Sequence, residues 1–276
     1  LHQTLPIYEL IVLDDGSTDD SRHWLETELP RLAPEAQIIL NADNSGSPFV
    51  QWLAGLERAR GDYVWIAEAD DLAAPSFLEE VMRGFATPDV VMSFTQSRQI
   101  DPTGEVLCGD YLDYVADLSR EQWRRPYTRS GHEEIAQALA VKNSIPNVSA
   151  VVFRRQAFLS VLRSNLERIR RYRIAGDWVA YLELLREGSI AFSPLALNDH
   201  RRHPRSLTLS NFNLMQLREI VEVQRQVANS IDLDADIRAK ADAYAQSLYE
   251  SFGLASREAP RFTDCEELGV AQASSR

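Results

Sequence analysis

The chain has 276 residues, of which 45% are hydrophobic and 25% are charged, a composition typical of a globular protein with one large or two small domains. Its formal net charge of −12 argues against non-specific nucleic-acid binding, because such binding requires a basic surface. The two cysteines, Cys108 and Cys265, lie far apart, and no apolar run has the length of a membrane span, so the composition fits a reducing, cytoplasmic setting.

The beginning of the chain alternates strand and helix patterns. Apolar runs over residues 8–13 and 37–40 predict two strands, and a helical-period pattern lies between them. Ser47 is placed to cap a helix that begins at Pro48 and ends at Gly61. The residues before the first strand resemble the end of an element whose beginning is absent, so we expect the chain to start after the first strand of its fold.

Three acidic residues follow the next expected strand. Residues 63–67 are short, β-branched and aromatic, which predicts a buried strand, and Glu68, Asp70 and Asp71 come directly after it. Ligands bind outside the carboxyl ends of parallel strands, so we expect these carboxylates at the rim of a crevice. Their mutual repulsion is relieved by a divalent cation, and carboxylates suit Mg²⁺ or Mn²⁺ together with substrate phosphates. The alternative is a solvated acidic turn that leads into a helix.

The rest of the chain continues the alternation. Ser130 and Glu133 form a capping box at the start of one of the expected helices. The pattern predicts an α/β fold: a mainly parallel, Rossmann-like sheet with helices on both faces, followed by a helical C-terminal part. Further strands are expected at residues 90–94, 148–153 and 190–192, and helices at residues 77–82, 135–141, 155–166 and across 213–253.

Charged residues gather at three places where loops are expected to meet. These are Asp14 and Asp15 after the first strand, the acidic residues at 68–71, and an Arg- and His-rich stretch at 200–205. Carboxylates that hold a cation, combined with Arg and His side chains that contact phosphate oxygens, suit a nucleoside diphosphate that leaves an activated substrate. The sequence has no P-loop and no Gly-x-Gly-x-x-Gly, which disfavours kinase-like and dinucleotide-binding chemistry. It also has no Gly-x-Ser-x-Gly nucleophile elbow.

Three further features have plain structural alternatives. Asp177 follows Gly176 at the start of an expected helix, where an acid is often only a cap. The four arginines at 168–173 form either a solvated helix face or a contact for anionic lipid or a phosphorylated acceptor. His200 and His203 taken alone are weak evidence for a metal site, because lone histidines are more often structural.

Several segments carry a family resemblance when they are taken in combination. They are residues 9–19, Asn44-x-Gly46, residues 55–63, residues 65–71, residues 145–155, Gly176-Asp177-Trp178 and Arg201-Arg202-His203-x-x-Ser206. With these segments the chain resembles the family 2 glycosyltransferases, which have the GT-A fold. The resemblance implies a glycosyltransferase domain at residues 1–210 without its first strand, a helical extension at 211–256 and a tail or linker at 257–276.

The resemblance also implies an activity and a set of roles. The activity is transfer of a sugar, with inversion, from a nucleoside-diphosphate donor to the hydroxyl group of a glycan or lipid-linked glycan acceptor. Asp14 or Asp15 corresponds to the residue that contacts the nucleoside, and Asp177 to the general base. Arg202 and His203 match the loop that closes over the diphosphate, and Asp70 with His203 is assigned to the Mg²⁺ or Mn²⁺ ion.

One residue departs from the family pattern. Glu68 stands where the family usually has the first Asp of its Asp-x-Asp motif, and its side chain is one methylene longer. Together with the expected absence of the first strand, this keeps a second function open, a nucleotide- or glycan-binding module that has lost turnover. For the enzyme we expect a bacterial setting, surface polysaccharide or lipid-linked glycan synthesis at the cytoplasmic face of the membrane, with peripheral membrane association through residues 168–173 as a further hypothesis.

Overall fold

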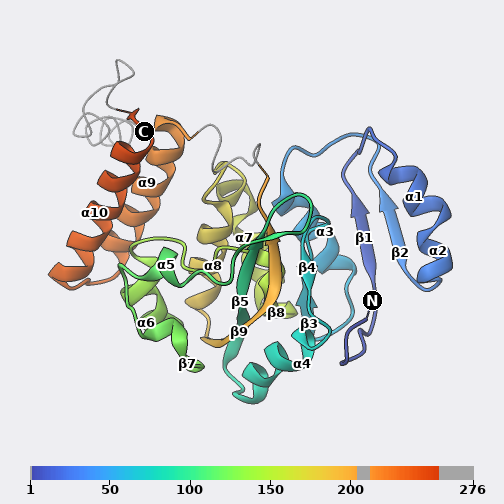
Figure 1. Ribbon diagram of the computed structural model, residues 1–276, viewed down its shortest axis with the longest axis horizontal. Coiled ribbons are helices and arrows are strands. Elements are labelled where there is room, and N and C mark those ends of the chain that lie inside the picture. Colours follow the sequence, from blue (N-terminus) through green and yellow to red (C-terminus); the bar gives the residue numbers. More distant parts are fainter. Residues whose placement is uncertain (1, 204–211, 255–276) are drawn as a thin grey trace.

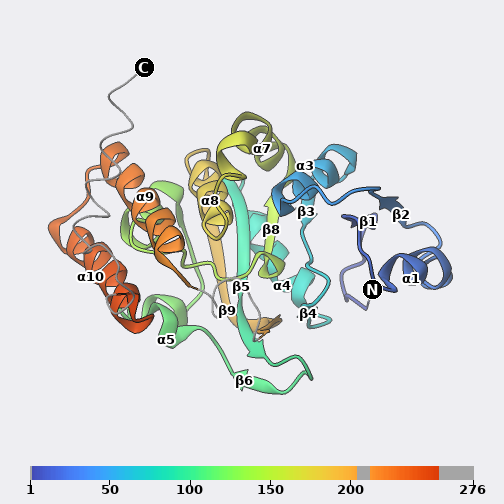
Figure 2. The ribbon, with the colours of Figure 1, turned by 90° about the horizontal axis from the view of Figure 1, so that it is seen from above.

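The computed structural model describes residues 2–203 and 212–254 and consists of three parts that lie side by side (Figure 1). A seven-stranded sheet with its helices is at the centre. A small two-stranded sheet with two short helices lies on one side, and a pair of long helices near the C-terminus lies on the other (Figures 1 and 2). The expected α/β class with a helical C-terminal part is therefore confirmed.

The small sheet consists of β1 (Ile11–Asp14) and β2 (Gln37–Leu40), which pair in parallel. Between them lie α1 (Ser21–Thr27) and α2 (Leu29–Leu32). The sequence predicted a single helix with one apolar face here, but a new helix starts at Leu29 with Pro30 in its first turn, and Trp24 stays 46% exposed. The first strand also begins later than expected, at Ile11, and the Glu9 carboxylate before it accepts hydrogen bonds from the backbone of Arg60 and Gly61.

The large sheet has the strand order β3-β8-β5-β9-β4, with β6 on the far part of β5 and β7 beside β9. Only β5 and β9 pair in parallel among its described strands, so the expectation of a mainly parallel sheet is wrong. The alternation of strands and helices does not determine which strands pair. The late strand β8 inserts between β3 and β5 and runs antiparallel to both. The strands are β3 (Tyr63–Trp65), β4 (Leu72–Ala73), β5 (Val90–Ile100), β6 (Val106–Cys108), β7 (Tyr127–Ser130), β8 (Val151–Arg154) and β9 (Ser189–Arg201).

Helices cover both faces of this sheet, as expected. On one face, α4 packs Phe77, Leu78 and Val81 into a small apolar cluster. The main core lies on the other face, under α3, α7 and α8. The helices are α3 (Pro48–Arg58), α4 (Phe77–Met82), α5 (Leu112–Val115), α6 (Gly131–Glu134), α7 (Arg155–Ile169) and α8 (Gly176–Leu185). The capping box at the start of α6 is confirmed, and a π-helical turn over residues 135–139 follows it.

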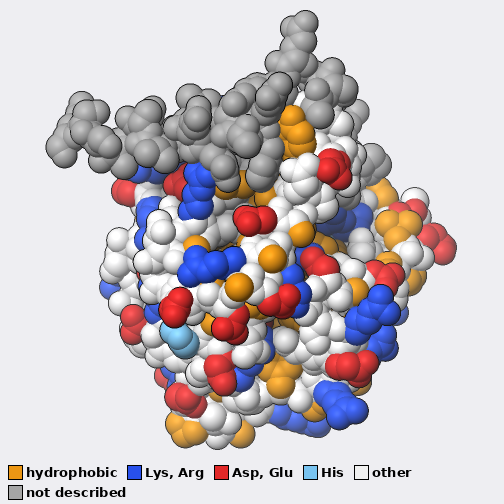
Figure 3. Space-filling model, turned by 90° about the vertical axis from the view of Figure 1, so that its left-hand side faces the viewer, with side chains coloured by type: hydrophobic (Ala, Val, Ile, Leu, Met, Phe, Trp, Pro, Cys, Tyr) orange, Lys and Arg blue, Asp and Glu red, His pale blue; other side chains and the backbone are white. Residues whose placement is uncertain are grey.

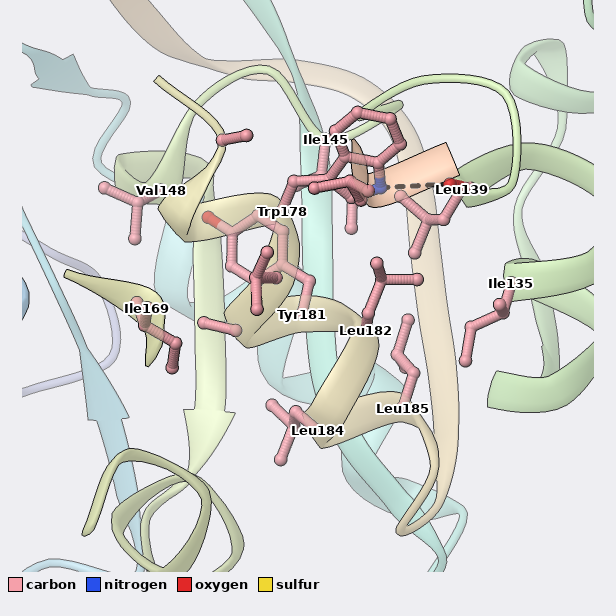
Figure 4. Packing of buried hydrophobic residues seen from close by; sticks show 14 of the residues in the cluster. Ile135, Leu139, Ile145, Val148, Ile169, Trp178, Tyr181, Leu182, Leu184 and Leu185 are labelled. Carbon is pink, nitrogen blue, oxygen red and sulfur yellow. Dashed lines mark hydrogen bonds between the residues drawn. The ribbon is translucent and has the colours of Figure 1, made fainter. Parts of the chain in front are cut away.

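Helix α8 is the most deeply buried helix of the core. All of its residues except Asp177 and Glu183 are buried, which is the pattern of a helix that is apolar all round. Figure 4 shows its side chains packed among those of neighbouring elements, with the Trp178 indole donating a hydrogen bond of 3.0 Å to the Leu139 carbonyl. A Cβ atom at Gly176 would lie 2.4 Å from the Phe49 ring, so only glycine fits at the start of this helix. Helix α8 is therefore a fixed platform for the one acid in its first turn.

Two long helices, α9 (Leu214–Ser230) and α10 (Ala235–Ser251), form the C-terminal pair. A helical pattern was predicted across this region, and the structure divides it at residues 231–234. Gln224 joins the pair to the core, because its buried amide donates to the Val141 carbonyl at 2.8 Å and to the Ala241 carbonyl at 3.0 Å. Apolar side chains of α9 and α10 belong to the main core cluster. The division of the chain into domains stays a prediction.

Candidate active site

A cleft of about 1040 Å³ lies between the end of β9, the loop after β3, and helices α8, α9 and α10. Four of the residues predicted from the sequence line it together: Asp70, Asp177, Arg202 and His203. They come from three separate stretches of the chain. Asp14, Asp15 and Glu68 do not line this cleft.

Asp70 is held in place through the backbone of its loop. Arg201 Nε donates to the Asp70 carbonyl at 2.7 Å, and the Arg201 backbone N–H donates to Asp71 Oδ1 at 2.9 Å. The other side of the loop is held by Ser149, whose Oγ accepts from the Glu68 backbone N–H at 3.0 Å. The Asp70 side chain itself is left 51% exposed, so its carboxylate is available to a ligand.

The Asp70 carboxylate faces His203. Its Oδ2 atom lies 3.2 Å from His203 Nε2, and the His203 side chain is 41% exposed. An imidazole nitrogen and a carboxylate oxygen are both metal ligands, and Mg²⁺ sites commonly combine one or two carboxylates with substrate phosphates. No group of three or more His, Cys, Asp or Glu side chains among the described residues could hold a metal ion. Asp70 and His203 could therefore supply two ligands to a cation whose other ligands come from a bound diphosphate. They do not form a metal site made of protein side chains alone.

Glu68 lies beside this pair but in a different environment. Although the residue is exposed, loss of water around its carboxyl group raises the pKa of Glu68. A hydrogen bond with Trp52 lowers this pKa, and the negative charges of Asp70 and Asp71 raise it further. A carboxyl group that is protonated more easily is a weaker metal ligand. Glu68, the residue that departs from the family pattern, is thus also less suited to bind a metal ion because its pKa is raised.

Asp177 occupies the first turn of α8. Burial raises the pKa of its carboxyl group to about 6, against hydrogen bonds from the Trp178 backbone N–H at 2.7 Å and from Asn143 Nδ2 at 3.0 Å. The residue at the cap position is Ala175, so Asp177 is not the cap that the sequence left open. A carboxylate with a pKa near neutrality suits a general base.

Arg202 and His200 form the other polar wall. Arg202 lines the cleft and interacts with the Tyr111 hydroxyl through its guanidinium group, while its buried Nε atom has no hydrogen-bond partner among residues 2–203 and 212–254. Burial and the Arg202 charge lower the pKa of His200 to about 4, and its Nδ1 atom lies 2.6 Å from the Tyr111 hydroxyl. His200 is therefore neutral at physiological pH, and the positive charge at this wall comes from the arginines Arg201 and Arg202.

Asp14 and Asp15 serve the loops of the small sheet. Asp14 is buried, accepts from the Ser17 backbone N–H at 3.2 Å and lies 3.5 Å from Arg22 Nε. Asp15 accepts hydrogen bonds from Asn41, Ser45 and Gln51. Partial burial raises the pKa of Asp15, but the Ser45 and Asn41 hydrogen bonds outweigh this effect and lower it. Asp14 thus holds the turn that leads to α1, and Asp15 holds the loop after β1 against residues 41–51.

Sequence reasoning missed the residues that position the site. Asn143 donates to Asp177 with its amide nitrogen and accepts from the Ile145 backbone N–H at 3.1 Å with its amide oxygen, which sets the orientation of the amide. Its carbonyl accepts from the Tyr114 hydroxyl at 2.9 Å. Nothing in the sequence pattern singles out one asparagine in a loop, so no signal pointed to this contact.

Comparisons with known proteins agree on the family and the fold. The model of the family "Glycosyl transferase family 2" matches residues 1–161. An uncharacterized glycosyltransferase of Haemophilus influenzae is 27% identical over 258 residues, which cover 86% of this chain and 70% of that protein. A putative teichuronic acid biosynthesis glycosyltransferase of Bacillus subtilis, TuaG, is 32% identical over 95 residues, which cover 34% of this chain and 37% of that protein.

Among solved structures, S. aureus TarS 1-349 in complex with UDP-GlcNAc is similar in fold, with a TM-score of 0.59 at 17% sequence identity. The similarity covers 91% of this chain and 66% of the TarS chain, so this chain spans just under two thirds of that structure. The GT-A type of fold expected from the sequence is thereby confirmed. On the match to more than half of its residues, the chain belongs to glycosyl transferase family 2.

Proposed function

We propose that the protein is a metal-dependent, inverting glycosyltransferase that moves a sugar from a nucleoside-diphosphate donor to an acceptor hydroxyl. One observation carries the proposal: Asp70, Arg202, His203 and Asp177 line a single cleft although they are far apart in the sequence. Family membership supports sugar transfer. The names of the relatives, with UDP-GlcNAc bound to TarS and teichuronic acid biosynthesis for TuaG, favour a UDP-sugar donor and a cell-surface glycan product.

The chemistry follows from charge and geometry. The acceptor oxygen forms a bond to the anomeric carbon while the bond from that carbon to the diphosphate oxygen breaks, and the electron pair leaves with the diphosphate. Asp177 accepts the hydroxyl proton, since its carboxyl group is mostly ionised at neutral pH. Arg202 offers a charged donor to the departing diphosphate. A divalent cation held by Asp70 and His203 supplies further neutralisation of that charge when it is bound.

The test measures nucleotide release and product formation from a panel of UDP-, GDP- and dTDP-sugars with Mg²⁺, Mn²⁺ or EDTA. We expect turnover with a divalent cation, its loss in EDTA, and a product of inverted anomeric configuration by NMR. Asp177→Asn should lower turnover by about 10²–10⁴-fold, because it removes the base. Glu183→Gln is the matched control, since Glu183 is the other acid of α8 and pairs with Arg168 instead of facing the cleft. Full activity of Asp177→Asn would refute the assignment of the base.

The rival function is a binding module without turnover, and the altered electrostatics of Glu68 favour it. Calorimetry with nucleoside diphosphates and Mn²⁺ separates the two functions. Nucleotide binding that depends on the metal, with no product from any donor in the panel, would favour the module.

We also propose that the enzyme works at the cytoplasmic face of the membrane. Within the described ranges, no helix has both the length and the apolar character needed to cross a bilayer. Two arginines of the basic run are already paired, Arg168 with Glu183 at 2.8 Å and Arg170 with Glu167 at 3.0 Å. Arg171 and Arg173 form no ion pair with another described residue, and we assign them to anionic lipid. Flotation with anionic liposomes tests this association: it should be lost in Arg171→Ala/Arg173→Ala, and absence of binding in the unmodified protein would exclude it.

No nucleic-acid partner is proposed. Figure 3 shows the face of the molecule that lies on the left in Figure 1, and its acidic and basic side chains are interspersed. A phosphate backbone requires a continuous basic surface, which this visible face does not offer.

A further inference from the structure

The cleft has two chemically different halves. One half is polar and contains Asp70, Asn143, Arg202 and His203. The other, here called the apolar half, consists of Ile174, Phe212, Ile220, Tyr244, Leu248 and Phe252. Five of these six residues belong to the C-terminal region with α9 and α10, so this region supplies a wall of the cleft as well as part of the core.

The apolar half is a built surface. The Phe212 and Phe252 rings stack with their centroids 4.5 Å apart, and Phe212 and Ile220 are buried. Leu248, Tyr244, Phe252 and Ile174 pack partly against the main core cluster, so their positions are set by that packing. A preformed apolar wall of this kind binds an apolar ligand without the cost of ordering the site.

Asp177 adjoins both halves of the cleft. Asn143 of the polar half donates a hydrogen bond to its carboxylate at 3.0 Å, and Ile174 of the apolar half precedes it by three residues in the chain. In the proposed reaction the diphosphate is held in the polar half. The acceptor hydroxyl must reach Asp177 from the opposite side, and the group that carries this hydroxyl then extends over the apolar half.

Charge narrows the chemistry of that group. None of the six residues of the apolar half carries a charge. The nearby Lys142 contacts the Tyr244 ring with its Nζ atom 4.4 Å from the ring centroid, but this ammonium group is already paired with Asp117 at 2.8 Å. Among the residues that the structure describes, a polyanionic acceptor such as a polyphosphate chain would therefore find no free counter-charge in the apolar half, whereas an apolar group would bury its surface.

We infer that the apolar half binds a hydrophobic group attached to the acceptor, so that the substrate class is an amphipathic glycoside or lipid-linked sugar. This inference rests on the proposed function for the direction from which the acceptor approaches. The binding site itself does not depend on turnover, because the wall exists in the folded chain.

The test is calorimetric titration with the methyl, phenyl and octyl glycosides of one hexose, each below its micelle concentration. Burial of several methylene groups predicts a Kd for the octyl glycoside at least about tenfold lower than for the methyl glycoside. A gain that grows with alkyl length identifies a lipid-like group, and a gain confined to the phenyl glycoside identifies an aromatic one. Equal affinities for all three would overturn the inference.

Two leucine variants separate specific binding from adsorption of detergent. Leu248 lines the cleft, whereas Leu214 is also partly buried on the core but does not line it. Leu248→Gln should lose most of the higher affinity for the octyl over the methyl glycoside, and Leu214→Gln should keep it. If both variants keep the gain, or both lose it, binding does not occur at the apolar half and the inference fails.

The same glycosides, used as acceptors with the donor panel, distinguish this inference from the proposed function. A lower KM for the octyl than for the methyl acceptor supports both the site and the enzyme, if Leu248→Gln removes this difference and leaves the KM for the donor unchanged. Calorimetric binding that depends on Leu248, without transfer from any donor, keeps the site and rejects the glycosyltransferase proposal. Transfer with equal KM values for methyl and octyl acceptors rejects the site and keeps the enzyme.

Discussion

Asn143 shows how a neutral side chain can tune the proposed base. Its amide donates to Asp177 Oδ2 at 3.0 Å and thereby favours the ionised carboxylate, while burial opposes ionisation. In Asn143→Ala the pKa of Asp177 should rise further above about 6, so turnover should begin at a higher pH. The pH profile of kcat/KM measures this shift of the acid limb.

A control and a contrary outcome are available for this prediction. Gln99 also has an amide that lines the cleft, but no hydrogen bond joins it to Asp177 among the described residues, so Gln99→Ala should leave the acid limb unchanged. An unshifted profile in Asn143→Ala would mean that the hydrogen bond orders the loop without affecting the proton affinity of the base.

The raised pKa of Asp177 also has a consequence for stability. The folded state binds this proton more tightly than the unfolded chain, for which the pKa is 3.8, so the stability of the native protein falls as pH rises from 3.8 to about 6. Above that range the full cost of burying the ionised carboxylate is present. Asp177→Asn should therefore be more stable than the native protein at pH 7.5, by at most about 3 kcal/mol.

Chemical denaturation at two pH values tests this. The gain in the free energy of unfolding should be present at pH 7.5 and should largely disappear near pH 3.5, where the carboxyl group is protonated in the folded state and mostly protonated in the unfolded chain. A gain that is equal at both pH values would show that the asparagine stabilises the fold by packing. Loss of activity together with gain of stability is the trade-off expected where a charge is kept in a buried place for function.

At this scale the sequence predicted part of the site. Asp70, Asp177, Arg202 and His203 were found because each lies at the end of an element or within a recognisable motif, and they do line one cleft. Asp14 and Asp15 were found by the same reasoning, yet their carboxylates are engaged within the small sheet. A motif identifies a side chain that is capable of binding or catalysis, but it does not specify which neighbours will form hydrogen bonds with that side chain in the folded protein.

At the scale of elements, the start of α8 sets the position of Asp177. A Cβ atom at Gly176 would lie 2.4 Å from the Phe49 ring and 2.9 Å from the Ile169 carbonyl oxygen, and the backbone atom cannot move away cheaply. Gly176→Ala should displace the first turn of α8 and lower the free energy of unfolding by about 1–3 kcal/mol. It should change kcat by a larger factor than the KM for the donor, because the displaced turn carries Asp177.

Gly109→Ala is the matched control, because nothing lies within 4 Å of a Cβ atom at that position. It should leave both stability and turnover within experimental error of the unmodified protein. If Gly176→Ala behaved like this control, α8 would be less firmly placed than its packing indicates.

At the scale of the whole molecule, local patterns predicted which elements form, and the long-range pairing could not be read from them. The expected strands at 37–40 and 90–94 exist, and so does the helix that starts at Pro48. The direction of the strands in the large sheet differs because β8 pairs with two partners far away in sequence. The joining of the two halves of the cleft also depends on long-range packing, since α9 and α10 meet α8 only in the folded chain.

The division into a small and a large sheet predicts unequal local stability. No residue of α1 is buried, and Asp14 is the only buried residue of β1, whereas most of β5 is buried. Few buried apolar contacts mean that the small sheet opens at a lower free energy than the large one. Hydrogen exchange measured by mass spectrometry should therefore show faster exchange for residues 11–14 and 37–40 than for residues 90–100 and 151–154.

The same measurement tests the role that the family resemblance implies for Asp14 and Asp15. If either residue contacts the nucleoside, a nucleoside diphosphate with Mn²⁺ should slow exchange in residues 11–20 and 37–47, because binding stabilises the folded form by mass action. Protection confined to segments that line the cleft, such as the end of β9 and the start of α8, would instead place the nucleotide wholly in the cleft. Asp15 would then act only by holding its loop against Asn41, Ser45 and Gln51.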